Sequence, residues 1–184
     1  MLKRPELLSP AGNLTKLKIA LEYGADAVYG SVASFSLRTR SAREFNLETF
    51  KEAIDYTHAK GKKFYATINA FPFNSQIEPL KRHLQTISAM KPDAFIIATP
   101  GVMSLAKAIA PDIEIHLSTQ ANVMNVLDAK IYHDMGAKRI VVAREMNLKD
   151  VIKIKEEIPT LDIEIFVHGS MCFAYSGRCL VSSV

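Results

Sequence analysis

The sequence lacks several features that would place it in a familiar class of protein. Its 184 residues contain no apolar stretch near the roughly 20 residues that a membrane-spanning helix needs, and its amino terminus has no apolar signal-peptide core. We therefore expect a cytoplasmic protein. Cysteine is scarce: Cys172 and Cys179 are the only two, and in a reducing cytosol they suit metal binding or redox chemistry better than a disulfide.

The signatures of three enzyme classes are also missing. No Gly-x-Gly-x-x-Gly follows the first predicted strand, which argues against a dinucleotide-binding sheet. The sequence has neither the His-Glu-x-x-His helix of zinc proteases nor the Gly-x-Ser-x-Gly turn of α/β-hydrolases. Proteolysis by either mechanism is therefore disfavoured.

The composition is that of an ordinary globular protein with a mild basic excess. Hydrophobic residues make up 48% and charged residues 23%, which excludes a disordered or fibrous chain. Lys and Arg number 23 against 19 Asp and Glu, and they are scattered rather than gathered in one run. This excess is compatible with an anionic partner such as RNA or a phosphorylated metabolite, but does not require one.

Short apolar or β-branched runs alternate with amphipathic helical patterns along the whole chain. The predicted strands are 6–9, 25–29, 63–69, 94–98, 114–118, 139–143 and 164–168. The predicted helices are 14–23, 47–60, 77–90, 102–109, 123–135 and 148–157. The glycines expected at helix ends are Gly24, Gly61 and Gly136, and the asparagines expected to cap helix starts are Asn13, Asn46 and Asn147.

This alternation predicts βαβ crossovers and a parallel sheet with helices packed outside it. Seven strands without a break at the midpoint favour an α/β fold of the incomplete TIM (β/α)8 type over an open doubly wound sheet. Residues 1–184 are then expected to be the amino-terminal part of a TIM-barrel-like domain in a longer protein. Open barrel edges would pair with further sequence or support a homo- or hetero-oligomer.

Polar residues follow the carboxyl ends of the predicted strands, where the loops of a TIM barrel build its active site. The candidates for substrate binding are Asn13, Asn69, His116, Ser118 and Asn122. The candidates for catalysis are Gln120, Arg144, Glu145 and His168.

Several of these candidates have a structural alternative. Asn13 fits a helix cap better than a ligand contact, and Arg144 with Glu145 fits a structural ion pair. The alternation of His116, Ser118 and Gln120 predicts three polar side chains on one face of a buried strand, where they need partners or a function.

The most specific segment is EIFVHGSMCFAYSGRCLVS, residues 164–182. Its Cys-x₆-Cys spacing, with Gly177 between, allows Cys172 and Cys179 to ligate one metal ion or cluster. Thiolates suit zinc or iron–sulfur, and either usually needs four ligands. His168 is a candidate third ligand, but the chain lacks a complete set.

This segment resembles the signature of the collagenase-like peptidase family, the peptidase family of unknown catalytic type 32. Every fixed position of the pattern Glu-x-Phe-x₂-Gly-Ser/Ala-aliphatic-Cys-x₄-Gly-x-Cys-x-aliphatic-Ser is met. Residues 6–13, 24–30 and 117–122 also resemble the family, so the resemblance covers essentially the whole chain. One departure is Gly30-Ser31, where family members tend to carry an aliphatic residue and then glycine.

The resemblance implies several activities. The family is named for protease and collagenase activity, and other members are oxygen-independent hydroxylation proteins that act on tRNA wobble uridine, rRNA cytidine or the ubiquinone ring. The resemblance implies that those members bind a 4Fe-4S cluster through four cysteines. Cys172 and Cys179 match the first two of the four. For the RNA-modifying branch, the resemblance also implies prephenate as hydroxyl source.

Three functions are therefore open. The favoured one is an RNA hydroxylation enzyme that acts on tRNA, in which Gln120, Asn69 and His116 contact the substrate and Arg144 binds a carboxylate or phosphate. The second is a peptidase that acts on protein, with Cys172 as nucleophile beside His168. The third is a non-catalytic subunit of a hydroxylation complex. In each case we expect this chain alone to be inactive, because its barrel and its ligand set are incomplete.

Overall fold

The computed structural model describes residues 4–32, 45–169 and 174–176, in which strands and helices alternate. The strands are β1 (Leu8–Pro10), β2 (Ala27–Gly30), β3 (Lys63–Ile68), β4 (Ala94–Ile97), β5 (Glu114–Leu117), β6 (Arg139–Val141) and β7 (Asp162–Glu164). The α-helices are α1 (Leu14–Glu22), α2 (Leu47–Ala59), α3 (Ile77–Ala89), α4 (Pro100–Ile109), α5 (Val126–Asp134) and α6 (Leu148–Glu157). Short 3₁₀ helices, η1 (Asn74–Gln76) and η2 (Thr119–Ala121), lie between them.

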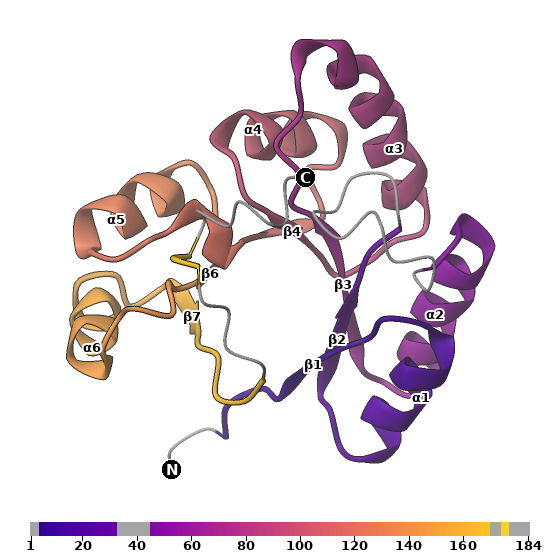
Figure 1. Ribbon diagram of the computed structural model, residues 1–184, viewed down its shortest axis with the longest axis horizontal. Coiled ribbons are helices and arrows are strands. Elements are labelled where there is room, and N and C mark those ends of the chain that lie inside the picture. Colours follow the sequence, from indigo (N-terminus) through magenta and orange to yellow (C-terminus); the bar gives the residue numbers. More distant parts are fainter. Residues whose placement is uncertain (1–3, 33–44, 170–173, 177–184) are drawn as a thin grey trace. The chain divides into compact units, whose positions relative to one another are not determined.

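The strands form one sheet whose order is the order of the chain, β1 to β7. The described pairings are parallel: Leu8 lies opposite Ala27 and Ala27 opposite Lys63, while Arg139 lies between His116 and Asp162. This register confirms the predicted parallel α/β architecture, in which a helix carries the chain from each strand to the next (Figure 1).

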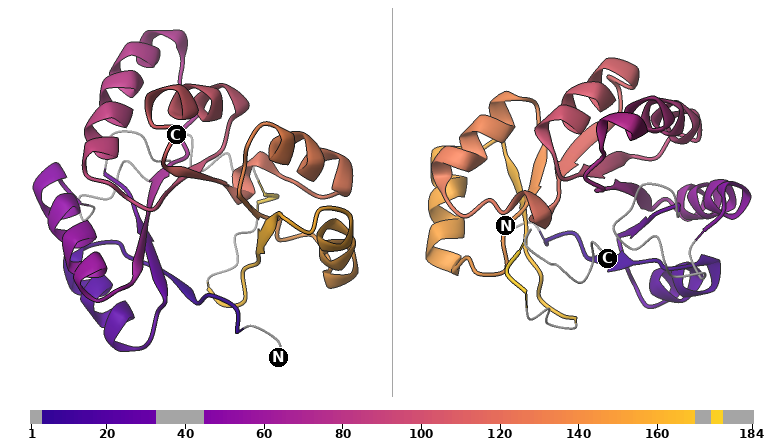
Figure 2. Two further views of the ribbon diagram at one scale, coloured as in Figure 1. Left: turned by 180° about the vertical axis from the view of Figure 1, so that it is seen from behind. Right: turned by 45° about the horizontal axis from the view of Figure 1, so that its top comes forward.

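The chain divides into two compact units, with β4 shared between them. One unit contains Met1–Ile68 and Pro72–Phe95, and the other contains Asn69–Phe71 and Ile96–Val184. In the first unit, α1 and α2 pack against each other beside β1 to β3, and in the second, α5 packs against α6 beside β6 and β7 (Figures 1 and 2).

Three buried phenylalanines form the centre of the first unit's core. The ring of Phe50 lies 5.0 Å from that of Phe64, and the Phe45 ring lies 5.7 Å from Phe50, all edge to face. Gly30 faces this cluster: a Cβ there would meet the Phe45 ring at 2.9 Å and the Ala11 carbonyl oxygen at 3.0 Å. Gly30 is therefore needed for close packing rather than only for a turn.

The helix ends follow the sequence signals closely. Asn13, Asn46 and Asn147 each accept a hydrogen bond from the backbone N–H three residues later. Gly24, Gly61 and Gly136 have positive φ just beyond their helices, as predicted.

Two predicted elements differ from the structure by more than two residues at one end. Helix α5 begins at Val126 rather than 123, because Asn125 caps it through the Asp128 N–H. Strand β7 covers 162–164 rather than 164–168. Its last described link to β6 is the hydrogen bond from Val142 N–H to the Glu164 carbonyl, and Ile165–Val167 beyond it are exposed.

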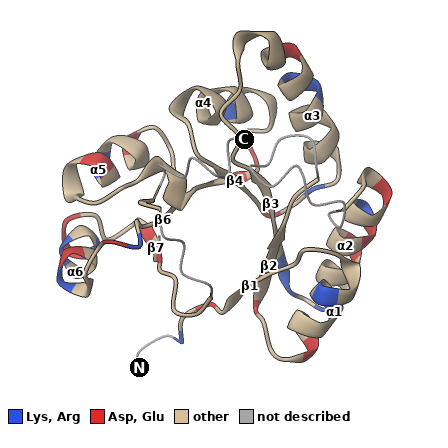
Figure 3. Cartoon of the chain, in the orientation of Figure 1, with Lys and Arg blue, Asp and Glu red and all other residues tan. Residues whose placement is uncertain are grey.

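The surface carries both signs of charge. Lys and Arg are scattered over the helices among Asp and Glu rather than gathered in one place (Figure 3). None of the helices within the described ranges has the length and apolarity to cross a membrane.

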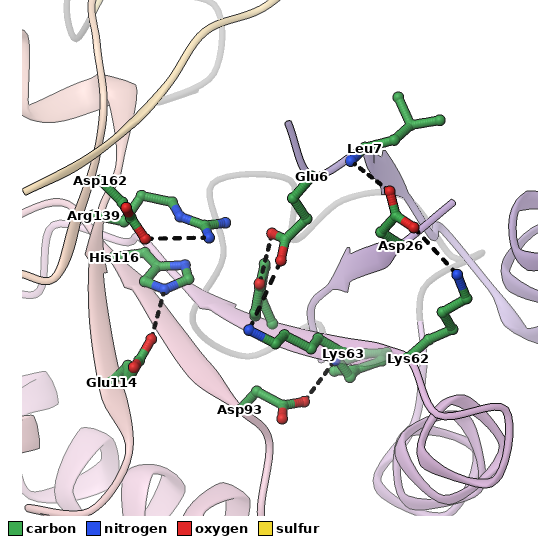
Figure 4. A network of polar contacts seen from close by, with 12 residues as sticks. Glu6, Leu7, Asp26, Lys62, Lys63, Asp93, Glu114, His116, Arg139 and Asp162 are labelled. Atoms are coloured by element: carbon green, nitrogen blue, oxygen red, sulfur yellow. Dashed lines mark hydrogen bonds and ion pairs between the residues drawn. The ribbon is translucent and has the colours of Figure 1, made fainter. Parts of the chain in front are cut away.

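Asp26, immediately before β2, links three parts of the first unit. Its carboxylate accepts hydrogen bonds from Leu7 N at 3.0 Å and from Lys62 Nζ at 3.2 Å (Figure 4). Arg4 Nη2 donates to both carboxylate oxygens. The Leu7 N–H, followed by Lys62, holds the pKa of Asp26 below its ordinary value of 3.8, and slight desolvation opposes them.

We expect Asp26 to stabilise the fold in a pH-dependent way. Because its folded pKa is depressed, this contribution is complete above pH 3.8 and is lost as the pH falls through the lower folded value. Asp26→Asn should therefore lower Tm at neutral pH. In a series of thermal melts down to about pH 2, the difference in Tm between this variant and the wild type should become smaller. Asp112→Asn, an exposed control, should track the wild type. A gap that stays constant through the acid range would contradict this role.

Candidate functional site

The loops that follow β5 and β6 are joined by hydrogen bonds. Thr119 Oγ1 donates to the Val142 carbonyl at 3.0 Å, and Ala143 N donates to the Val123 carbonyl at 3.1 Å. Both loops follow the carboxyl ends of neighbouring parallel strands, the edge where barrel enzymes place their active residues. The sequence prediction of polar loops gathered at this edge is confirmed for these two strands.

A third segment, Ala174–Ser176, is held against these loops. The Arg144 guanidinium donates to the Ala174 carbonyl at 2.8 Å and to Ser176 Oγ at 3.2 Å. Ser176 N donates to Glu145 Oε1 at 2.9 Å, and the Tyr175 hydroxyl donates to the Met124 sulfur at 2.6 Å. We call residues 118–124, 142–146 and 174–176 the rim site.

The environment of Glu145 favours its ionised form. Desolvation raises the pKa of its carboxyl. Hydrogen bonds from the backbone N–H of Ser176, its own backbone N–H and the Ser176 hydroxyl, with the charge of Arg144, outweigh that effect. The net pKa is lowered. Glu145 is therefore a hydrogen-bond acceptor in this site rather than a proton donor near neutral pH.

Two amide oxygens of the rim site are buried without a partner. Among the described residues, Gln120 Oε1 and Asn122 Oδ1 are inaccessible and accept no hydrogen bond. Ser118 is also buried, but its hydroxyl accepts from Gln120 N at 3.3 Å and caps η2. A buried polar atom without a partner costs free energy, so Gln120 and Asn122 are the residues here that best fit a ligand contact.

The backbone of Asn122 has an unusual conformation. It is left-handed, with φ 56° and ψ 44°, at the end of η2. Asparagine tolerates this conformation better than most residues. The residue type at position 122 therefore has a backbone reason as well as a side-chain one.

His116 lies in a different polar group from the one predicted. Strand β5 ends at Leu117 and the chain turns into η2, so His116, Ser118 and Gln120 do not form a single row on one strand face. The buried His116 has Nε2 3.4 Å from Glu114 Oε2, and its Cα pairs with that of Arg139, the first residue of β6 (Figure 4). The structure groups it with charged residues at the amino ends of these strands.

The remaining predicted residues are placed separately. Asn13 caps α1 in the first unit, as its structural alternative stated, and Asn69 is half-buried just after β3. His168 is exposed beyond β7. Cys172 and Cys179 fall outside the described residues, so their role as metal ligands stays a prediction. The described part of the chain contains no group of three His, Cys, Asp or Glu side chains able to hold a metal.

Sequence reasoning missed Ser176. It occupies a variable position of the Cys-x₆-Cys pattern, yet it is 1% exposed and bonds to both Arg144 and Glu145. A single serine in a short stretch of mixed polarity gives no periodic signal of burial. The sequence could point to it only through its position between the two cysteines.

A parallel sheet in chain order, with polar loops after its strands, defines an α/β chain of the incomplete TIM-barrel type. A solved structure of a U32 peptidase has this fold: it superposes with a TM-score of 0.71 at 17% identity, over 90% of this chain and 70% of that one. This chain matches Peptidase family U32 over residues 12–184 and belongs to that family.

Two curated relatives are much more similar in sequence. The tRNA hydroxylation protein P of Helicobacter pylori is 66% identical, and its namesake in Escherichia coli is 45% identical, each over 97% of this chain. The match covers 42% of the first relative and 39% of the second. The chain therefore spans about two fifths of the length of these relatives.

Proposed function

We propose that this chain carries the substrate-binding rim and two cluster ligands of an enzyme that hydroxylates tRNA in the cytoplasm. The observation that supports it most is the pair of buried, unpartnered acceptors, Gln120 Oε1 and Asn122 Oδ1, in a site that also holds Ala174–Ser176 from between the two cysteines. The high identity to tRNA hydroxylation protein P over nearly the whole chain favours the same activity.

The two amide oxygens suit recognition of a nucleobase. A carbonyl oxygen accepts hydrogen bonds, and uracil offers an N–H donor on its pairing edge. A base displayed in a single-stranded loop, such as a wobble uridine, can present that edge to a protein pocket. One of the two oxygens would then accept this N–H when the substrate is bound, and the ribose 2′-hydroxyl is a donor for the other.

Cys172 and Cys179 would supply two ligands of a 4Fe-4S cluster, and the remaining ligands would come from elsewhere in the protein. Paired thiolates are the donors that such clusters use, which is why the residue types fit. When bound, the cluster would supply electron-transfer or Lewis-acid chemistry. Prephenate, which the family resemblance implies, is the hydroxyl source in this proposal.

The predicted contact of Arg144 with a substrate carboxylate or phosphate is not part of the proposed function. Its Nε and one terminal nitrogen already donate within the chain, so its contacts differ from those predicted for a carboxylate- or phosphate-binding residue. Glu145 likewise accepts from Ser176. The proposal therefore rests on the amide side chains for substrate recognition.

The test is the modified-nucleoside content of tRNA, measured by mass spectrometry in a strain that lacks this gene. We expect the hydroxylated wobble uridine to disappear and to return with the natural gene product. Asn122→Gly should restore it poorly, because glycine keeps the left-handed backbone while removing the amide oxygen. Unchanged nucleosides in the deletion strain would reject the proposal.

A peptidase is the second candidate, favoured by the solved U32 peptidase of the same fold. It predicts that the purified natural protein cleaves gelatin and that Cys172→Ser abolishes the cleavage. Cleavage that survives this variant would exclude Cys172 as the nucleophile.

A further inference from the structure

We propose that Arg144 and Glu145 are positioning residues that fix Ala174–Ser176, which lie between Cys172 and Cys179 in the chain, rather than catalytic groups that touch substrate. This inference rests on the proposed function in one respect, since it takes the two cysteines as ligands. It assigns to the pair a role that differs from both the predicted catalytic role and a simple ion pair.

The two residues hold the segment from several directions. Arg144 uses its backbone N–H and its guanidinium Nε on the same Ser176 oxygen, each at 3.2 Å, and reaches the Ala174 carbonyl with a third donor at 2.8 Å. Glu145 accepts from the Ser176 N–H at 2.9 Å. A planar guanidinium with several donors in fixed directions is suited to fixing both position and orientation.

Ser176 is the point on which these contacts converge. Its oxygen accepts two hydrogen bonds, and its hydroxyl also stabilises the ionised form of Glu145. Its side chain is almost wholly buried, so an alternative placement would leave partly buried donors of Arg144 without this acceptor. This penalty makes one placement of the segment much more favourable than others.

The anchored residues lie between the two cysteines in the chain. Ala174 is two residues beyond Cys172, and Ser176 is three residues before Cys179. Fixing both therefore fixes the points from which the chain leads to each thiol. Groups that orient metal ligands without binding the metal typically contribute about 10- to 100-fold in metal affinity.

A third contact connects this segment to the substrate residues. The Tyr175 hydroxyl donates to the sulfur of Met124, which follows Asn122 by two residues. The same segment is thus attached to the β6 loop by Arg144 and Glu145 and to the β5 loop by Tyr175. This arrangement fixes the position of Ala174–Ser176 relative to the residues proposed to bind the base.

The experiment compares paired substitutions in the natural full-length protein, purified without oxygen. Arg144→Ala and Ser176→Ala remove the contacts, and Arg144→Lys keeps the charge but not the forked donors. Glu145→Ala removes the acceptor, whereas Glu145→Gln keeps an oxygen that can accept from Ser176 N. Arg82→Ala, an exposed arginine on α3, is the matched control.

Five quantities are measured for each variant. They are Tm, hydrogen–deuterium exchange of the peptide that contains 174–176, iron bound per chain, the electron paramagnetic resonance spectrum of the reduced protein, and tRNA hydroxylation in a complemented deletion strain. We expect Arg144→Ala, Ser176→Ala and Glu145→Ala to speed exchange of that peptide and weaken iron binding about 10-fold or more. Arg144→Lys should lie between, and Glu145→Gln and Arg82→Ala should match the wild type in exchange and iron.

The outcomes separate this inference from the proposed function. Wild-type protein that binds no iron, with exchange still protected by Arg144, would reject the cluster and leave the anchoring established. Wild-type iron, spectrum and exchange in folded Arg144→Ala and Ser176→Ala would overturn the positioning role. Glu145→Gln that keeps iron and protection but loses hydroxylation would assign Glu145 to the chemistry and also overturn it.

Discussion

Gln120→Leu is expected to leave the protein at least as stable as the wild type while lowering tRNA hydroxylation about 10- to 100-fold. Gln120 Oε1 is buried without a hydrogen-bond partner, a condition that costs roughly 1–3 kcal/mol. An apolar side chain of similar size removes that cost. It also removes the acceptor proposed for the base, and a factor of ten in affinity corresponds to about 1.4 kcal/mol.

Thermal melts and nucleoside analysis of complemented strains measure the two effects side by side. Gln85→Leu, at an exposed position on α3, is the matched control and should leave both hydroxylation and Tm close to the wild type. Loss of stability in Gln120→Leu, or undiminished hydroxylation, would show that the Gln120 side chain serves the fold and not the substrate.

Phe64→Ala should have the largest effect on stability, a loss of about 3–5 kcal/mol in the free energy of unfolding. Phe64 is wholly buried on β3, and its ring packs 5.0 Å from that of Phe50 and 6.4 Å from that of Phe45. Truncation leaves a cavity among residues from α2, β3 and the Phe45 bridge, which the rigid sheet cannot close.

Urea unfolding followed by circular dichroism measures this loss. The control is Phe73→Ala, which truncates the same residue type where it is 77% exposed and should change stability by less than about 0.5 kcal/mol. Equal effects of the two substitutions would mean that the aromatic cluster contributes little to the core.

Much of the fold was predictable because its signals are local. The Asn46 and Asn147 side chains cap α2 and α6 by accepting a hydrogen bond from the backbone N–H three residues later. Gly61 has the left-handed conformation that ends α2. These effects depend on residues within a few positions of one another. The order of the strands in the sheet was also predictable from the sequence, because a run of βαβ units strongly restricts the topology.

The site was predictable only in part, because its decisive contacts are not local. Gln120 and Asn122 were predicted from polarity after a strand, and the structure leaves their oxygens buried and unpartnered. Their contact with a substrate stays a prediction. The anchoring of Ser176 by Arg144 joins residues 32 positions apart, and no periodic pattern encodes it. His116 was misplaced because an alternating pattern cannot show that a strand ends at Leu117.

The order of strands in the sheet has a consequence for how the chain acquires its structure. Leu8 pairs with Ala27 and Ala27 with Lys63, so each of these pairings closes a loop of a few tens of residues, at a modest entropic cost. In pulsed hydrogen exchange during refolding, the amides of β2 should become protected even at times when those of β7 are not yet protected. A growing polypeptide with this topology can add each new strand to the one made just before it, while the ribosome is still extending the chain.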